Sequence, residues 1–309
     1  MTSIVIVGAY PPPVGGTSIH IQRLHELLKG SHRYNPIVID PYQPPSVDIT
    51  SNPISNVHKT GPLGIISLLK VVIKIKVMQP DIIHFHVSAM TKFIFAGPIF
   101  LLFKPSNSKT VITIHAGSLI DELQERNIFI RLLAKYLMLN FDKIIAVNKS
   151  LTKFLIKLGC NSEDVYTVPA FLPPTIASTF ELSSAVTNIH NIKKRIIISS
   201  GYCIPLYGLD IIANAFAKSD YIRENYYLVL CLYHTYNEWY LKKLNQILSK
   251  VPDSLIMKDL DSEHFNFMLK NSSIYVRATD TDGDAVAIRE ANYYGLSVVA
   301  SRLSSICRP

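Results

Sequence analysis

One stretch near the end of the chain, residues 274–301, constrains the fold more than any other. It begins with a β-branched, apolar run typical of a buried strand and continues into an acidic turn. Residues 285–294 contain no helix breaker, so we predict a helix with Asp284 as its N-cap and Gly295 just past its end. Residues 297–300 predict a second buried strand. A strand–turn–helix–strand unit of this kind is typical of a parallel sheet.

The start of this helix has the chemistry of a phosphate site. At the carboxyl edge of a parallel strand, a helix N-terminus offers free backbone N–H groups and a positive dipole end. Asp282 lies in the turn, and Glu290 can reach back over it because helical side chains lean toward the N-terminus. Backbone donors for a diphosphate and carboxylates for hydroxyl groups predict a nucleotide-sugar site. A plain acidic surface turn with a solvated Glu fits the spacing equally well.

Asp282 and Glu290 are separated by seven residues and are followed by Ala291, Gly295 and the strand at 298–300. This pattern resembles the signature of glycosyltransferase family 4, whose retaining members usually carry Glu, Gly-Phe-Gly-Leu, Glu-Ala and Gly-x-Pro-Val. The resemblance implies that Glu290 binds the ribose hydroxyls. It also implies that Asp282 contacts the donor sugar in the catalytic site, although Asp282 is one methylene shorter than the family's Glu.

The same resemblance assigns the backbone of the turn. It implies that the N–H groups of Asp284, Ala285 and Val286 face the diphosphate or the sugar. Asp284-Ala285 stands where the family has Phe-Gly, and Ser297 stands where it has Pro.

Two metal-binding interpretations of the acidic turn at 280–284 fit less well. A calcium loop would place its Gly two positions later and would carry Glu rather than Ala291 at position twelve. A metal-binding Asp-x-Asp motif of the other large transferase fold is disfavoured because a helix and a strand follow. We therefore predict that the site uses neither a metal ion nor a cofactor.

The composition narrows the class of partner and the location. The formal charge of +8 suits an acidic partner, but no basic stripe with interleaved aromatics of the nucleic-acid-binding kind is present. Phosphorylated substrates and an anionic membrane surface are therefore favoured over nucleic acid. The four Cys are scattered, which indicates free thiols in a reducing compartment. With no signal peptide or spanning stretch, we expect a cytoplasmic protein, peripheral on the inner face of the plasma membrane.

The first half alternates strand and helix patterns, which predicts a doubly wound sheet. Between its first strand (3–8) and first helix (18–28) lies a Pro-rich loop with Gly15 and Gly16, where a ligand can approach the backbone closely. This loop resembles the Gly-Gly loop that closes over the donor phosphates in family 4. His20 follows and is interpreted as a helix-face residue.

Two buried strands, 81–86 and 111–115, each end in His at the edge where sites of open α/β sheets lie. The residues around His115, Thr-Ile-His-Ala-Gly, resemble the family's Thr-x-His-Gly region, which implies a catalytic position near the transferred sugar and the acceptor. His84 and His86 are weaker candidates, because a buried His is more often a satisfied core residue.

A predicted helix in the first half combines basic and apolar residues. Residues 63–77 have Lys70, Lys74 and Lys76 among aliphatic residues. The pattern favours a core-facing helix with a solvated basic side, and the alternative is a patch that contacts anionic lipid.

The length of 309 residues suggests two domains. The segment 173–194 is Pro- and Ser/Thr/Asn-rich without periodicity, so we predict a linker there. It separates an N-terminal Rossmann-like, acceptor-side domain (1–172) from a C-terminal Rossmann-like, nucleotide-sugar-binding domain (195–309). Two doubly wound parallel-sheet domains facing across a cleft are the GT-B fold. Because GT-B proteins usually continue further, we expect the second domain to be incomplete.

The loop at 201–208 departs from the family pattern Gly-Arg-x-x-x-x-Lys-Gly. Tyr202 and Tyr207 replace the two cations that normally offset the charge of the leaving diphosphate. Arg277 and the helix dipole are the candidates to compensate, whereas Arg289 is expected to face solvent.

The resemblance as a whole implies a retaining, metal-independent glycosyltransferase. It would move a sugar from a nucleotide donor, with UDP favoured, to an acceptor hydroxyl on a lipid-linked glycan in bacterial surface polysaccharide assembly. Two alternatives stay open. One is a nucleotide-sugar-binding protein without turnover, which the missing cations and the expected short second domain favour. The other is a nucleotide-sugar epimerase of the same fold.

Overall fold

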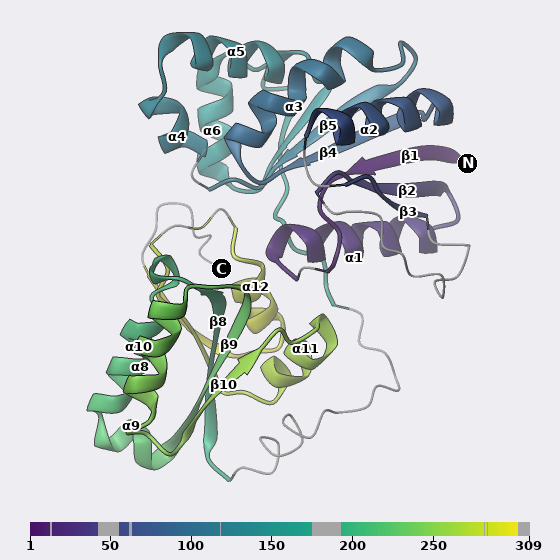
Figure 1. Ribbon diagram of the computed structural model, residues 1–309. Helices are drawn as coiled ribbons and strands as arrows, with labels where there is room; N and C mark the ends of the chain where they lie inside the picture. Colours follow the sequence, from purple (N-terminus) through teal and green to yellow (C-terminus); the bar gives the residue numbers. More distant parts are fainter. Residues whose placement is uncertain are drawn as a thin grey trace.

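The computed structural model contains two parallel β-sheets, each with helices on both faces (Figure 1). The strand order is β3-β2-β1-β4-β5-β6-β7 in the first sheet and β10-β9-β8-β11-β12 in the second. The structure describes residues 1–12, 14–42, 56–61, 64–117, 119–174, 193–280, 282 and 284–301.

The elements follow the alternation that the sequence predicted. The first sheet and its helices comprise β1 (Thr2–Val7), α1 (Gly16–Gly30), β2 (Tyr34–Asp40), β3 (Val57–Lys59), α2 (Ile65–Met78), β4 (Ile82–Val87), α3 (Met90–Phe103), β5 (Lys109–Ile114), α4 (Leu119–Glu125), α5 (Ile128–Leu139), β6 (Lys143–Ala146), α6 (Lys149–Leu158) and β7 (Val165–Thr167). The second comprises β8 (Arg195–Cys203), η1 (Pro205–Tyr207), α8 (Leu209–Lys218), α9 (Asp220–Asn225), β9 (Tyr226–Tyr236), α10 (Glu238–Leu248), β10 (Ser254–Lys258), α11 (Ser262–Lys270), β11 (Ile274–Arg277), α12 (Val286–Tyr293) and β12 (Ser297–Ala300).

The β-branched strands are buried on both faces because helices cover the sheets from both sides. In β1, Val5 and Val7 pack into the core beneath α2 and α3, whereas Ile4 and Ile6 pack against Ile21 of α1. This alternation follows from the two-residue period of a strand. In the second sheet, α8 and α10 cover one face and α11 and α12 cover the other (Figure 1).

The predicted fold class is confirmed. Both sheets are parallel throughout, and in each the chain starts in the middle and winds outward in both directions. The carboxyl ends of the two sets of strands face each other across a cleft. Ligands of doubly wound sheets bind at this edge, near the point where the strand order reverses.

Individual residues set three local features of the first domain. Residues 57–59 form β3, which pairs in parallel with β2. The stretch 119–139 contains two helices, because the Asn127 side chain caps the start of α5 by accepting from Ile130 N at 3.0 Å. The apolar run with Gly97 and Pro98 lies within α3, and there Gly97 lets the helix approach Leu137 of α5 closely.

Two expectations lie largely outside the described residues. Most of the predicted linker, 175–192, is outside them, so the division of the chain there stays a prediction. Residues 302–309 of the second domain are outside them as well.

Two other expectations concern the described residues. Cys160, Cys203 and Cys231 are buried free thiols. No helix in the described part of the chain has both the length and the apolar character needed to cross a membrane.

Candidate functional site

The cleft between the two sheets has a volume of about 690 Å³ and is the candidate site. Loops after β1, β4 and β5 form one wall, and loops after β8 and β11 together with the start of α12 form the other. All of the residues that the sequence nominated for catalysis or donor binding line this one cleft: Gly15, Gly16, His115, Arg277, Asp282, Asp284, Ala285, Val286 and Glu290.

The N-terminus of α12 differs from the prediction in its cap. The N-cap is Ala285, which provides no side-chain cap, rather than Asp284. The Asp284 carboxylate instead accepts from Arg289 Nε at 2.6 and 2.8 Å and from Ala170 N of the first domain at 2.7 Å. Arg289 is therefore paired and only 22% exposed, so the expectation that it faces solvent is wrong. Among the described residues around it, the start of α12 has no side-chain cap from its N-cap, and it lies at the cleft wall.

Glu290 is 4% exposed and forms an ion pair with Arg23 of α1. Arg23 also donates to the carbonyl of Leu172 at 3.0 Å. Burial raises the pKa of Glu290, and Arg23 opposes this rise. Sequence reasoning missed Arg23. Its position four residues after Ile19, on the buried face of α1, was the available signal.

Asp282 is held by Arg277, which stands on the strand that enters the turn. Arg277 donates to Asp282 Oδ2 from Nη2 at 2.7 Å and from Nε at 3.1 Å, and to the carbonyl of Ser200 at 2.8 Å. The guanidinium lies over the ring of Tyr207, with 4.9 Å between its carbon and the ring centroid. A cation therefore occupies the neighbourhood of Tyr207, where the family pattern places a Lys.

Gly15 and Gly16 bring the start of α1 against the second domain. Gly15 is the N-cap of α1, and Ser18 Oγ hydrogen-bonds its backbone N–H and carbonyl, each at 3.0 Å. A Cβ on Gly15 would lie 3.0 Å from the Tyr202 hydroxyl, and one on Gly16 would lie 3.6 Å from Val286. The N-termini of α1 and α12 therefore meet at the cleft, and both direct backbone N–H groups toward it.

His115 belongs to a group of histidines at the carboxyl edge of the first sheet. Its Nε2 lies 2.9 Å from His86 Nδ1, and the His20 ring lies 5.1 Å from its ring, centroid to centroid. His84 stands beside them and hydrogen-bonds Thr113 Oγ1 at 2.7 Å. We call His20, His86 and His115 the histidine cluster. His20 was expected only as a residue of a helix face; it lies on α1, but it is buried and belongs to this cluster.

The cluster is neutral near pH 7. Burial lowers the pKa of His20 to about 4 and holds the pKa values of His86 and His115 well below their usual range. Of the three, His115 lines the cleft. A neutral imidazole can donate one hydrogen bond and accept another, so His115 suits contact with sugar hydroxyls.

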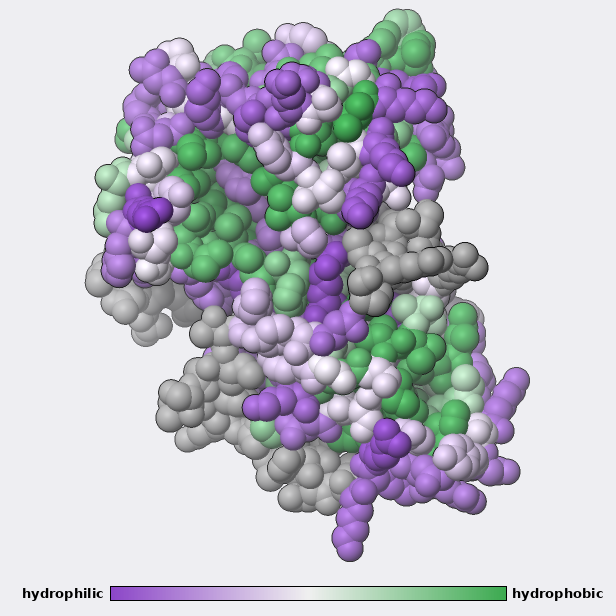
Figure 2. Space-filling model, turned by 180° about the vertical axis from the view of Figure 1, so that it is seen from behind, coloured by the Kyte–Doolittle hydropathy of each residue, from purple (hydrophilic) through white to green (hydrophobic). Residues whose placement is uncertain are grey.

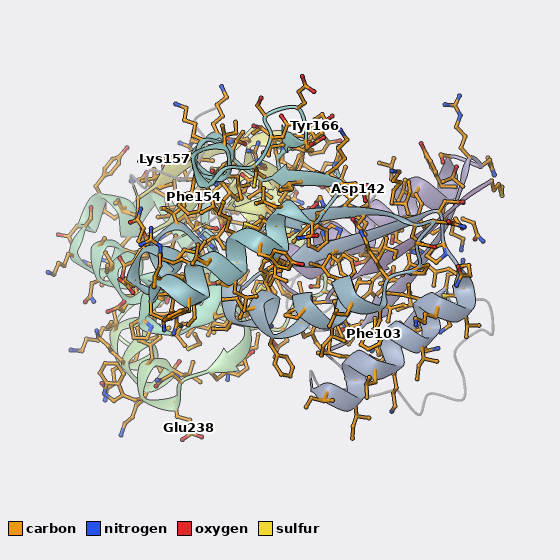
Figure 3. All side chains as sticks on the ribbon, turned by 90° about the horizontal axis from the view of Figure 1, so that it is seen from above. Phe103, Asp142, Phe154, Lys157, Tyr166 and Glu238 are labelled. Atoms are coloured by element: carbon orange, nitrogen blue, oxygen red, sulfur yellow. The ribbon has the colours of Figure 1, made fainter. Side chains whose placement is uncertain are left out.

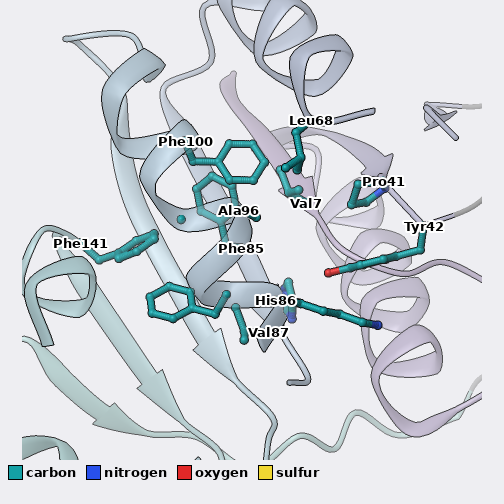
Figure 4. Close-up of a pocket in the computed structure, with 13 residues that line it drawn as sticks. Val7, Pro41, Tyr42, Leu68, Phe85, His86, Val87, Ala96, Phe100 and Phe141 are labelled. Atoms are coloured by element: carbon teal, nitrogen blue, oxygen red, sulfur yellow. The ribbon is translucent and has the colours of Figure 1, made fainter. Parts of the chain in front are cut away.

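His86 also lines a small cavity of about 30 Å³ behind the cleft, together with Tyr42, Leu68 and Phe100 (Figure 4). A cavity of this volume has room for about one water molecule. This cavity is far too small for a nucleotide sugar, whereas the interdomain cleft is large enough to hold one.

Comparison with known proteins gives a family and a fold. The chain matches the model of Glycosyltransferase Family 4 over residues 14–175, just over half of its length. No curated protein matches it.

Three solved structures share the fold at low sequence identity. Sucrose-phosphate synthase from Thermosynechococcus elongatus aligns with a TM-score of 0.73 and 16% identity over 98% of this chain and 82% of that one. HepE of Anabaena in complex with UDP-glucose aligns with a TM-score of 0.69 and 13% identity over 98% and 81%. A protein described as a UDP-N-acetylglucosamine 2-epimerase from Listeria monocytogenes aligns with a TM-score of 0.64 and 15% identity over 96% and 78%.

Proposed function

The chain belongs to glycosyltransferase family 4. We propose that it is a retaining, metal-independent enzyme that transfers the sugar of a UDP-sugar donor to an acceptor hydroxyl. The observation that carries this proposal is the cleft itself. One edge of it combines the uncapped start of α12 with the carboxylates of Asp282 and Glu290. Amide donors and carboxylates at this spacing match the two parts of a nucleotide sugar, its diphosphate and its hydroxyl groups.

In this proposal the donor lies along α12. Glu290 accepts from the ribose hydroxyls, and the backbone N–H groups of Asp284, Ala285 and Val286 bind the diphosphate or the sugar. The N-terminus of α1 at Gly15 and Gly16 approaches from the other wall. HepE, which shares the fold, was solved with UDP-glucose, and this supports a UDP-linked donor over other nucleotides.

Arg277 compensates for the two cations that the family pattern has and this chain lacks. Its guanidinium stacks on Tyr207, pairs with Asp282 and lines the cleft. When a donor diphosphate enters, Arg277 is the cation on the second-domain wall that can turn toward it. The pairing with Asp282 keeps this charge neutralised beforehand.

His115 and Asp282 act at the transferred sugar. The bond from the sugar's anomeric carbon to the diphosphate breaks, and the acceptor oxygen forms its bond to the same face of that carbon. The acceptor proton leaves with a diphosphate oxygen, whose growing charge the α12 amides and Arg277 stabilise. His115, neutral and inside the cleft, orients the sugar by hydrogen bonding.

The acceptor in this proposal is a lipid-linked glycan of bacterial surface polysaccharide assembly, used at the inner face of the plasma membrane. Apolar side chains are exposed on α2 (Ile65 62%, Ile66 72%, Ile73 60%, Val77 79%) and on α5 (Ile128 55%, Phe129 78%, Leu132 55%). Figure 2, a view from behind, shows hydrophobic residues on the surface of both domains. We call the exposed apolar residues of α2 and α5 given above the outer apolar face.

Cations accompany this face. Lys70 and Lys76 are exposed on α2, and Lys76 lies over the ring of Phe103, which projects at the end of α3 (Figure 3). Because α3 packs between α2 and α5, the exposed side chains of all three helices belong to one side of the domain. Apolar side chains mixed with Lys suit the surface of an anionic bilayer.

A titration followed by a turnover assay tests the proposal. UDP, GDP and uridine are titrated calorimetrically, and UDP-sugars are then incubated with a membrane extract that supplies lipid-linked acceptors. We expect preferential binding of UDP, followed by UDP release and a sugar-extended lipid that keeps the anomeric configuration of the donor. Transfer with inverted configuration, or transfer that stops when a chelator is added, would contradict the retaining or the metal-independent part.

The epimerase is the second candidate, and its support is the structural likeness to the Listeria protein described above. It predicts conversion of the donor sugar without any acceptor, which chromatography of the nucleotide sugar would detect. A binding protein without turnover predicts UDP-sugar binding with neither transfer nor conversion.

A further inference from the structure

The histidine cluster has more ring nitrogens than hydrogen-bond partners. His20 Nδ1 and His86 Nε2 are buried and have no partner in the described part of the chain. His20 is 8% exposed and His86 is 3% exposed, so bulk water does not replace the missing partners. Buried polar atoms without a partner are rare in proteins and call for an explanation.

The mutual geometry of the three rings supplies an explanation for His20 Nδ1. One ring nitrogen from each of His20, His86 and His115 lies within 4.8 Å of the other two. The ring centroids are 5.5 Å apart for His20 and His86, 5.1 Å for His20 and His115, and 5.2 Å for His86 and His115. With Zn–N bonds of about 2.0–2.1 Å, three imidazoles in a tetrahedral site place their centroids about 5 Å apart.

We propose that His20, His86 and His115 together bind one divalent transition-metal ion of the Zn²⁺ class. His86 Nδ1 and His115 Nε2 lie 2.9 Å apart. They become two ligands when the ring that donates the proton between them changes to its other tautomer, with the proton on its far nitrogen, and the ion takes the vacated place. Ligand nitrogens around tetrahedral zinc are about 3.3 Å apart, so the two rings separate by only a few tenths of an ångström. His20 Nδ1 is the third ligand, and a solvent molecule completes the tetrahedron.

The surroundings meet two further requirements of such a site. The His20 ring hydrogen-bonds the backbone of Ala170, an outer contact of the kind that fixes the orientation of metal-binding histidines. His115 lines the cleft, so an ion can enter from there.

Three separate elements supply the ligands, namely α1, β4 and the loop after β5. Their close approach depends on Gly8, where a Cβ would lie 2.4 Å from Ile21 of α1 and 3.1 Å from the Cβ of His86. An ion would therefore tie α1 to the sheet beside the Gly15–Gly16 turn. This site shares His115 with the transfer reaction proposed above, whose bond-making and bond-breaking steps use no metal.

The test uses the whole chain, freed of metal with a chelator and dialysed. Zn²⁺ is titrated calorimetrically, and Co²⁺ is added as a spectroscopic probe of the ligands. We expect one ion per chain, a visible Co²⁺ spectrum of a four-coordinate site, and a rise in the unfolding temperature with Zn²⁺. In His20→Gln and His115→Gln, the affinity should fall at least about tenfold, because each removes one ligand.

His25→Gln is the matched control. His25 lies on the same helix and is 6% exposed, and one of its ring nitrogens has no partner among the described residues, but it is not in the cluster. Its variant should bind the ion like the wild type. Wild-type chain that takes up no stoichiometric ion overturns the proposal whatever the variants do. Equal affinity in all four proteins, or the intense ultraviolet absorption of a Co²⁺–thiolate bond, also overturns it.

Discussion

Arg23 of α1 and Glu290 of α12 form a buried ion pair that joins the two domains across the floor of the cleft. Both side chains are less than a tenth exposed, and they are 267 residues apart in the sequence. Glu290 is the carboxylate that we assign to the donor ribose. The Glu290 carboxylate therefore serves both the proposed binding of the donor ribose and the contact between the domains.

Replacing Glu290 with Gln should weaken UDP binding by about tenfold or more, because a charged acceptor for the ribose hydroxyls is lost. Isothermal titration with UDP measures this loss, and a thermal melt confirms that the variant is folded. Glu263→Gln, an acid in the first turn of α11, is the control and should bind UDP normally. Unchanged UDP affinity in Glu290→Gln would remove the ribose assignment.

Removing only one partner of the Arg23–Glu290 pair should destabilise the protein by about 3–5 kcal/mol, because the other charge is left buried and unpaired. Urea unfolding of Arg23→Met and Glu290→Met measures each cost. The double variant should recover most of the loss, since Met fills similar volume without a charge to bury. Additive losses in the double variant would show that the pair is not coupled.

Arg277→Lys and Arg277→Ala test the compensating cation. We expect Arg277→Ala to weaken binding of UDP more than binding of uridine, because the lost interaction is with the diphosphate. Lys at this position keeps the charge but loses the stacking on Tyr207, so it should be intermediate. Equal effects on UDP and uridine would contradict the assignment to the diphosphate.

His115→Gln should lower kcat by about a hundredfold, because the oriented imidazole is proposed to contact the sugar during transfer. UDP affinity should change little, since UDP carries no sugar. Initial rates together with UDP titrations separate the two effects, and His84→Gln serves as a neighbouring control. A fall in UDP affinity as large as the fall in kcat would indicate structural damage instead.

The outer apolar face gives a prediction about membranes. Ile66→Glu combined with Phe129→Glu should abolish co-sedimentation with vesicles that contain phosphatidylglycerol, because both exposed side chains lose their apolar contact and gain like charge. Lys70→Glu should reduce binding in a salt-dependent way. Trp239→Glu, an exposed apolar site on the other domain, is the control. Vesicle binding that survives the double substitution would place the contact elsewhere.

The sequence by itself determined the fold class and the location of the site. Runs of β-branched residues separated by amphipathic helices admit only parallel, two-faced sheets, and the carboxyl edge of such sheets is where ligands bind. His115 and Asp282 follow strands, and Glu290 lies in the second turn of the helix after them, so local pattern was enough to place them near that edge. The Gly295 position past α12, with φ of 77°, was predicted for the same local reason.

Only the tertiary structure decided which partners these residues have. The Asp284 carboxylate accepts from Ala170 N, and Arg23 pairs with Glu290, because the docking of the two domains brings distant segments together. The histidine cluster arose likewise, from α1, β4 and β5 meeting at Gly8. Local sequence fixes backbone conformation through short-range sterics and hydrogen bonding, whereas contacts across hundreds of residues depend on how finished elements pack.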